Sequence, residues 1–191
     1  MTDSQRPTIA EEEFLKLAYS RFYEIEDKVF ADDFLSKDSE LRFNLIKDGF
    51  AIYSEILNYE PIKWELEEMK TKRPPMESEI SKDLFRLVRN LIFHFPFFTN
   101  WNEVFVTKQL VNWNKPGQSI DKFLEKYKGT PAVKYRLWES REQRMTYVTI
   151  NFPVYYNEEE KIFLKDIINE TEGVKFSFAL MKKIIVTQIK K

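Results

Sequence analysis

The chain has 191 residues, of which 43% are hydrophobic and 16% aromatic, so it can bury the core of one folded domain over residues 1–191. Its 30 lysines and arginines against 31 aspartates and glutamates give a net charge of −1, which excludes a protein that grips nucleic acid over its whole surface. The absence of cysteine excludes disulfides and thiolate chemistry, and a single histidine excludes a multi-histidine metal site within one chain.

The first predicted elements are two amphipathic helices. Thr8 and Glu11 have the spacing of a capping box before a helix over residues 9–30. Its apolar residues recur at intervals of three and four: Phe14, Leu17, Ala18, Phe22, Ile25 and Val29. A helix over residues 39–59 is predicted to direct a second apolar set toward a core: Leu41, Leu45, Phe50, Tyr53, Ile56 and Leu57. The charged, proline-broken residues 61–78 are predicted to be a connection.

The third predicted helix is the most apolar stretch of the chain, and Ser78 or Ser81 is expected to cap it. Its core face is predicted to hold Leu84, Leu87, Val88, Leu91, Phe95 and Phe98. Four polar residues lie within it: Arg86, Arg89, Asn90 and His94. Residues four apart share a helix face, so Arg86, Asn90 and His94 form one row, which the long side chain of Arg89 can reach. Such a row is costly to bury unpaired, and therefore needs a partner, a ligand or a wet cleft.

His94 is the one histidine of the chain, so any imidazole acid–base chemistry must use it. Pro96 is expected to end or kink the helix directly after it. His94 would then lie in the last helical turn, where the helix dipole favours the protonated imidazole. A cationic imidazole beside arginine suits an anionic substrate, although a lone histidine in an apolar helix is more often a hydrogen-bonded core residue.

The remaining chain predicts further short elements. Trp101 and Trp113 can stack on bases, but packing in a core is the favoured interpretation. A short helix is expected over residues 119–127, with a break at residues 129–131. Residues 158–168 have helical spacing that is interrupted near Gly173, and a final helix covers residues 176–188.

Residues 134–150 leave two structures open. Aromatic and β-branched residues favour two short strands joined by a polar turn at residues 139–144, whereas the lack of glycine and proline also permits one helix over residues 135–148. The densest basic patch lies here, on Lys134, Arg136, Arg141 and Arg144. Because Glu139 and Glu142 offset part of this charge, a solvated face is favoured over a surface for RNA.

The fold class predicted from these elements is mainly α. We expect a helical bundle with a helical core over residues 9–128, a small β-hairpin in the C-terminal third within residues 131–156, and C-terminal helices over residues 157–191.

Around the central helix the chain resembles the HEPN superfamily, helical nucleotide-binding and ribonuclease domains of prokaryotes and higher eukaryotes. The signature of that family is an arginine, often followed by a polar residue, and a histidine four to six positions later. Arg89, Asn90 and His94 stand here as R-N-L-I-F-H, which has the shorter spacing. The close resemblance covers about residues 80–100.

The resemblance implies a metal-independent endoribonuclease with Arg89, Asn90 and His94 as catalytic residues, and Arg86 is expected to bind substrate. RNA cleavage needs both a base and an acid, and one histidine cannot comfortably fill both roles. A homodimer with two copies of His94 in one cleft could, and the ribonucleases of the family resemble such dimers. The alternatives are a noncatalytic HEPN-like module that binds a nucleotide or a partner protein, and a helical scaffold.

The expected partners are RNA or a nucleotide and a second copy of the chain. The family context adds an antitoxin protein, since such domains serve as toxins or effectors in toxin–antitoxin and phage defence systems. No cofactor and no metal are predicted, although composition leaves a carboxylate site for magnesium open. No apolar run approaches about 18 residues without charge and no signal-peptide core is visible, so a cytoplasmic protein without membrane contact is expected.

Overall fold

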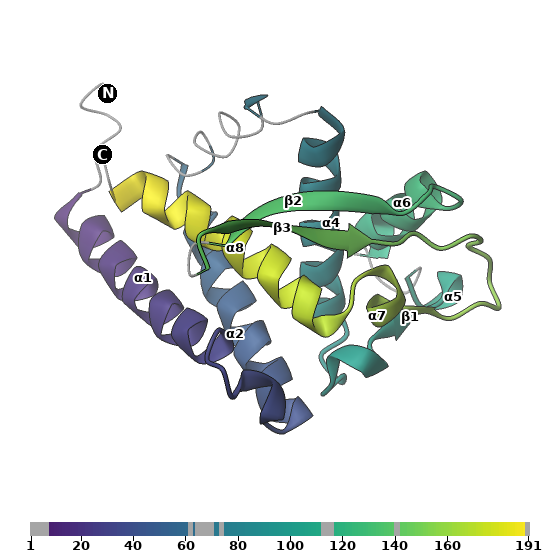
Figure 1. Ribbon diagram of the computed structural model, residues 1–191, viewed down its shortest axis with the longest axis horizontal. Coiled ribbons are helices and arrows are strands. Elements are labelled where there is room, and N and C mark those ends of the chain that lie inside the picture. The colour runs from purple at the N-terminus through teal and green to yellow at the C-terminus, as the bar shows by residue number, and fades with distance from the viewer. Residues whose placement is uncertain are drawn as a thin grey trace. The chain divides into compact units, whose positions relative to one another are not determined.

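The structure is a computed structural model that describes residues 8–60, 63, 71–72, 75–111, 117–139 and 142–189 (Figure 1). The chain divides into two compact units, residues 1–73 with 180–191, and residues 74–179. The fold is mainly helical with one small β-hairpin, so the predicted fold class is confirmed. The expectation of a single domain over residues 1–191 stays a prediction.

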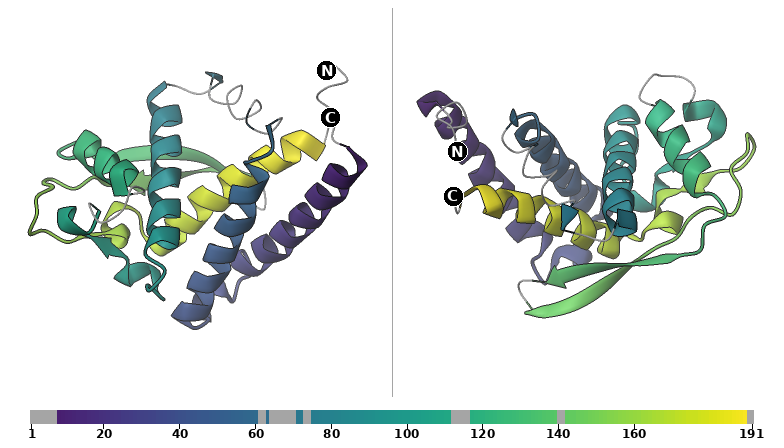
Figure 2. Two further views of the ribbon diagram at one scale, coloured as in Figure 1. Left: turned by 180° about the vertical axis from the view of Figure 1, so that it is seen from behind. Right: turned by 90° about the horizontal axis from the view of Figure 1, so that it is seen from above.

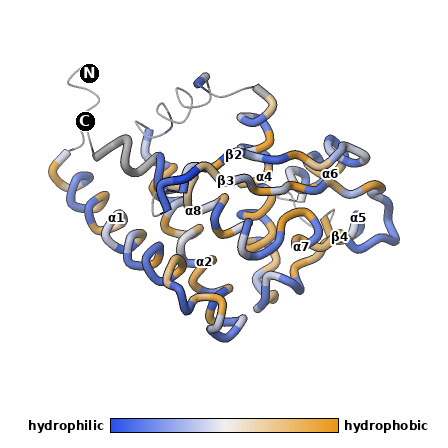
Figure 3. The backbone as a smooth tube through the Cα atoms, viewed as in Figure 1, coloured by the Kyte–Doolittle hydropathy of each residue, from blue (hydrophilic) through white to orange (hydrophobic). Residues whose placement is uncertain are grey.

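The first unit contains α1 (Ile9–Val29), the 3-10 turn η2 (Phe34–Ser36), α2 (Ser39–Ile56) and the second half of α8 (Glu170–Ile189). The capping box is confirmed, because the Thr8 hydroxyl accepts from the Glu11 backbone while the Glu11 carboxylate accepts from the Thr8 backbone N–H. Asp38 caps α2 by accepting from two backbone N–H groups. Figure 3 shows the alternation of hydrophilic and hydrophobic residues along α1 and α2 that the sequence predicted.

The core of this unit forms between α1 and α2 from residues such as Phe22, Ile25, Phe43, Ile46 and Phe50. Three residues predicted to face a core are instead exposed: Phe14, Leu17 and Leu41. Helical spacing specifies which face of a helix is apolar, but not how far along that face a neighbouring helix extends. Of the predicted connection, residues 61–62, 64–70 and 73–74 lie outside the described residues, whereas residues 75–78 are helical and not part of a connection.

The second unit begins with α4 (Pro75–His94), which starts earlier than the predicted caps Ser78 and Ser81. Proline is favoured at the first helical position because its missing N–H would have had no intrahelical partner there. The predicted core face of α4 is confirmed, since Leu84, Leu87, Val88, Leu91, Phe95 and Phe98 are all buried. The helix ends at His94, as the following proline predicted.

After α4 the chain forms η3 (Trp101–Glu103), β1 (Phe105–Val106), α5 (Lys108–Val111) and α6 (Gly117–Tyr127). Trp101 is a core residue, as predicted, and its Nε1 donates to the carbonyl of Ile168 at 3.1 Å. Trp113 lies outside the described residues. α6 starts two residues before its predicted beginning and ends where predicted.

The β-hairpin is confirmed over the helical alternative. β2 (Val133–Glu139) pairs antiparallel with β3 (Arg144–Ile150), from Val133 opposite Ile150 to Glu139 opposite Arg144. Figures 1 and 2 show the two strands side by side. Its inner face packs on the first half of α8, where the rings of Tyr135 and Phe176 lie 5.1 Å apart.

Two predictions about the C-terminal third are wrong. Residues 158–168 are not one helix but β4 (Ile162–Phe163) followed by the single turn α7 (Leu164–Ile167). β4 pairs with β1, so a partner far away in sequence overrides the local helical spacing. The final helix begins at Glu170 and runs through Gly173, and the Asn169 side chain caps it by accepting from the Glu172 backbone.

Candidate functional site

Arg89, the first residue of the R-N-L-I-F-H segment, lies on an exposed side of α4 within the second unit. Lys82, Arg86, Arg89 and Phe93 are all exposed, and their spacing of four, three and four residues puts them in one stripe along the helix. We call these four residues the α4 stripe. Phe97, just after the helix, is exposed as well. The stripe is therefore a row of three cations that ends in solvent-facing aromatic rings.

The cations of the α4 stripe form no ion pairs with the described residues. Among the residues that the structure describes, no carboxylate forms an ion pair with Lys82, Arg86 or Arg89. The sequence suggested that the polar row of this helix, if buried, would need a partner, a ligand or a wet cleft. Because both arginines face solvent, they carry no burial cost, and their charge is available to an anion.

Asn90 is half-buried beside the stripe and is held by α6. Its side-chain amide donates a hydrogen bond to the hydroxyl of Ser119, in the first turn of α6. This contact fixes which way the amide points, because one of its donors is committed to the neighbouring helix. Ser119 is a residue that sequence reasoning did not assign to the site, and nothing in local spacing links it to Asn90, 29 residues away.

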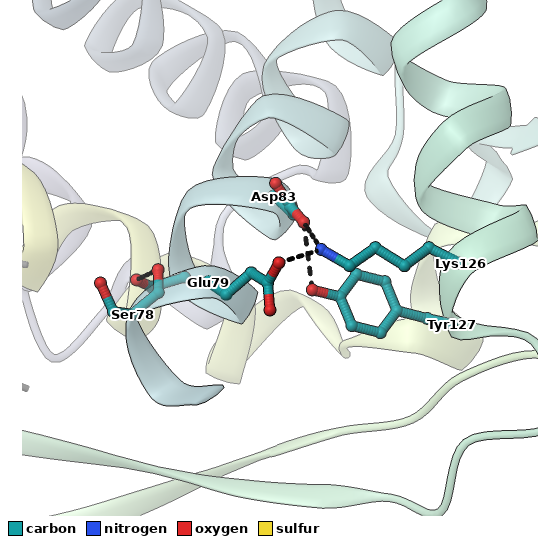
Figure 4. Close-up of polar contacts among 6 residues, drawn as sticks. Ser78, Glu79, Asp83, Lys126 and Tyr127 are labelled. Atoms are coloured by element: carbon teal, nitrogen blue, oxygen red, sulfur yellow. Dashed lines mark hydrogen bonds and ion pairs between the residues drawn. The ribbon is translucent and has the colours of Figure 1, made fainter. Parts of the chain in front are cut away.

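At the end of the α4–α6 pair opposite to Asn90, a cluster of polar and charged side chains joins the two helices (Figure 4). The Lys126 ammonium donates to Glu79 at 2.6 Å and to Asp83 at 2.7 Å, and the Tyr127 hydroxyl donates to Asp83 at 3.1 Å. Asn90 on α4 meets Ser119, whereas the earlier Asp83 meets the later Lys126, so the two helices run antiparallel. These contacts set the register in which Ser119 reaches Asn90.

The electrostatics of that cluster favour the charged lysine. Partial burial alone would lower the pKa of Lys126, but hydrogen bonds with Asp83 and Glu79 outweigh it, so that the pKa is raised well above its ordinary value. Burial also raises the pKa of Tyr127 to about 12, which keeps its hydroxyl a donor at neutral pH. Lys126 thus stays protonated, and Tyr127 stays a hydrogen-bond donor, at physiological pH.

His94 is the last residue of α4, next to the exposed Phe93 and the buried Phe95. Burial of its half-covered imidazole, and next the charge of Arg89, lower the pKa of His94 below the ordinary value of 6.5. The sequence led us to expect a protonated ring at the helix C-terminus. Partial burial and the neighbouring cation instead favour the neutral imidazole, which is the form that can accept a proton.

The structure brings the four predicted site residues to the last three turns of one helix, with Arg86 and Arg89 exposed and Asn90 and His94 half-buried. A neutral imidazole close to an arginine can take a proton from a hydroxyl while a cation stabilises negative charge. One chain supplies a single imidazole, and therefore a single histidine for proton transfer. The catalytic and substrate-binding roles of these residues stay predictions.

The aromatic neighbours Phe93 and Phe97 were not predicted as part of the site. Phe93 follows Arg89 by one helical turn, which is the signal that could have identified it. In the described part of the chain, no group of three histidine, cysteine, aspartate or glutamate side chains is arranged to hold a metal ion. Nor does any described helix combine the length and apolar character needed to cross a membrane.

Comparison with protein-family models, with curated proteins and with solved structures found no match for this chain.

Proposed function

We propose that this protein is a metal-independent endoribonuclease of the HEPN type that acts as a homodimer. The observation that supports it best is an exposed Arg89 five residues before a half-buried His94 at the end of α4, where the charge of Arg89 helps to lower the pKa of His94. The neutral His94 imidazole would accept the proton of a ribose 2′-hydroxyl as this oxygen attacks the adjacent phosphorus. Arg89 would stabilise the charge that develops on the phosphate oxygens.

The dimer follows from the count of proton-transfer groups. The 5′-oxygen leaves only if an acid protonates it, and the His94 that has just accepted a proton from the 2′-hydroxyl on one side cannot also serve the other side at once. A second chain that places the C-terminal end of its own α4 beside the first would add a second imidazole and a second Arg89. The exposed Phe93 and Phe97 beside the motif give that contact an apolar surface.

Asn90 and Arg86 complete the proposal. Asn90, held by Ser119, would keep its remaining amide groups in a fixed position toward a phosphate oxygen or the imidazole. Arg86, one turn before Asn90 and free of described ion pairs, would bind a neighbouring phosphate. In a cell, such an activity would fit the toxin or effector of a defence or toxin–antitoxin system, which an antitoxin protein neutralises.

The test is RNA cleavage in the presence of a metal chelator. Wild type should cleave a labelled RNA and leave 2′,3′-cyclic phosphate ends, whereas His94→Ala and Arg89→Ala should lose about 100-fold or more of the rate. Lys82→Ala is the matched control, because it removes a cation of the same stripe three turns away from His94. The solution mass should be that of a dimer, and the rate per chain should fall on dilution as the dimer dissociates. Cleavage that survives in His94→Ala would remove the proposal.

The second candidate is a noncatalytic HEPN-like module that binds a nucleotide or a partner protein. The hydrogen bond from Asn90 to Ser119 favours it, since part of the motif already serves to join α4 to α6. For this function Arg86 and Arg89 would bind a phosphate or carboxylate, whereas His94 would only pack against its neighbours and take no part in binding. Binding of RNA or nucleotide that depends on Arg89 but not on His94, without any cleavage, would select this candidate.

A further inference from the structure

The outer face of the β-hairpin carries an unusual set of exposed side chains. Along β2 and β3, residues alternate between a buried inner face, with Tyr135, Leu137, Val148 and Ile150, and an exposed outer face. The outer face contains Lys134, Arg136 and Trp138 from β2 and Met145 and Tyr147 from β3. We call these five residues the hairpin platform.

The apolar members of the hairpin platform form a continuous patch. Trp138 lies directly opposite Met145, and Tyr147 is the diagonal neighbour of Trp138, a separation of about 7–8 Å that aromatic side chains can span. Trp138, Met145 and Tyr147 are 51%, 51% and 56% exposed. A cluster of large, exposed apolar side chains indicates a binding surface, whereas single scattered ones do not.

The cations of the platform stand beside the aromatic rings. Arg136 lies directly opposite Tyr147, and its Nε is anchored to Glu77 of α4 at 3.3 Å. Within the described residues, Arg136 forms an ion pair with no carboxylate other than Glu77, and Lys134 forms none. The Arg136 side chain is still 50% exposed, so the guanidinium is held in place while part of it faces solvent, where an anion can bind.

The carboxylates of the hairpin itself pair with cations that are not part of the platform. Glu139, on the opposite face, accepts from Lys175 of α8 at 3.0 Å and lies 4.0 Å from Arg144. Glu142 pairs with Arg144 beyond the platform. The sequence suggested that these acids offset part of the local basic charge, and they do so at Arg144. Among the described residues, Glu77, already paired with Arg136, is the one carboxylate in an ion pair with the platform.

We propose that the hairpin platform binds single-stranded RNA, with bases stacked on Trp138 and Tyr147 and phosphates against Lys134 and Arg136. Single strands offer a π-face and a phosphate in each nucleotide, which matches a surface on which aromatic rings and cations lie next to one another. A protein partner would have to supply carboxylates to both cations, and lysine is depleted in the centre of protein interfaces. The preference for RNA over DNA rests on the proposed function, whose substrate strand this surface would hold.

The first experiment measures binding separately from cleavage. The full chain with His94→Ala, in chelator, is titrated into a fluorescent oligouridine of roughly 12 nucleotides, and anisotropy gives the Kd. In this background Trp138→Ala and Tyr147→Ala should each weaken binding by about 5-fold or more. Lys134→Gln should lower the slope of log K against log salt by about 0.7. Tyr155→Ala is the control, because Tyr155 is 67% exposed but lies outside the hairpin, and its removal should change nothing.

Trp138→Ala could weaken binding simply by failing to fold. Trp138→Phe avoids this ambiguity, because it keeps an aromatic ring. It should retain most of the affinity of the His94→Ala background while abolishing most of the tryptophan quenching that the oligonucleotide causes. Affinity and quenching that stay within about 2-fold of the Tyr155→Ala control in all platform variants would overturn the proposal. So would a change of solution mass in Trp138→Ala without any change in RNA affinity, which would assign the surface to a second copy of the chain.

The two proposals fail in different ways. If wild type cleaves RNA through His94 but the platform variants bind RNA normally, the hairpin inference is lost and the nuclease stands. If the platform binds RNA but no cleavage depends on His94, the nuclease is lost and the inference stands as an RNA-binding surface.

Discussion

Gly173 of α8 lies directly against the indole of Trp101, so closely that no side chain fits between them. A Cβ atom built on Gly173 would lie 2.4 Å from Cζ2 and 2.7 Å from Cη2 of that ring. The ring cannot easily move, because it is buried and donates its N–H to the carbonyl of Ile168. The glycine is therefore required by a close approach of two elements far apart in the sequence.

Gly173→Ala should destabilise the protein although alanine is the better helix former. The gain in helix propensity is about 1 kcal/mol, whereas forcing a methyl group into a packed core costs about 1–3 kcal/mol. Because the new methyl would meet the buried indole of Trp101 directly, we expect the cost to exceed the gain. Urea unfolding should show a lower free energy of unfolding, by about 1–2 kcal/mol.

A Trp101→Phe background tests the cause of that loss. The smaller phenyl ring has no atom at the position of the indole Cζ2, so Gly173→Ala should cost less there than in wild type. An equal cost in both backgrounds would mean that the clash with the indole is not the reason.

This contact also explains why the C-terminal third was harder to predict than the helices before it. A glycine within a helical pattern is locally unfavourable, so the spacing predicted a break at Gly173. The reason to keep a glycine there is the indole of Trp101, which local sequence cannot show. The same limit applies to residues 158–168, whose helical spacing yields to pairing of Ile162 with Val106 and of Phe163 with Phe105.

Features that depend on neighbouring residues were predicted well. The capping box of Thr8, the helix end at His94 and the buried face of α4 follow from side chains within a few residues of one another. For the candidate site, sequence identified the residues on α4 but not their surroundings. Ser119 as the partner of Asn90 depends on how α6 packs against α4, and the exposure of both arginines depends on which side of α4 is covered.

The titration of His94 should occur below its ordinary pKa of 6.5, because burial and the charge of Arg89 both disfavour the imidazolium. The chain has one histidine, so a single pair of imidazole signals in a proton NMR pH titration reports it without further assignment. Arg89→Gln removes the neighbouring charge and should raise the midpoint, whereas Lys82→Gln should leave it unchanged. A midpoint above 6.5 in wild type would contradict the burial of the ring.

The same shift sets the direction of a stability change with pH. Below 6.5 the unfolded chain binds more protons at this site than the folded chain, because the folded pKa is the lower of the two. The contribution of His94 to stability is therefore complete above 6.5, falls as pH decreases toward the folded pKa, and levels off below it. The difference in unfolding free energy between wild type and His94→Gln, measured by urea denaturation at several pH values, should follow this course.

Ser119→Ala should separate the positioning of Asn90 from the presence of its amide. Loss of the hydroxyl removes the acceptor of the Asn90 amide, at a cost to stability of about 1 kcal/mol, and frees the side chain to rotate. If Asn90 acts on the phosphate or the imidazole, the RNA cleavage rate should fall in Ser119→Ala and further in Asn90→Ala. Ser119→Thr, which keeps a hydroxyl, should retain the rate. Unchanged cleavage in Ser119→Ala and Asn90→Ala would leave Asn90 with a purely structural role in joining α4 to α6.

Glu26 and Lys182 join α1 to the second half of α8 within the first unit, with the Lys182 ammonium 2.8 Å from the Glu26 carboxylate. Glu26 is only 4% exposed, whereas the lysine side chain remains about one-third accessible. Lys182→Met keeps most of the side-chain volume but leaves a buried carboxylate without its cation, which should cost about 1–3 kcal/mol of unfolding free energy. Glu26→Gln combined with Lys182→Met removes both charges and should recover part of that loss.

Lys16→Met is the matched control, since Lys16 and Glu12 form an exposed pair on α1. Loss of this exposed pair should cost no more than about 0.5 kcal/mol. Equal stability of the Lys182 and Lys16 variants in thermal and urea unfolding would mean that the buried carboxylate is satisfied without Lys182, and that this ion pair does not hold α8 to α1.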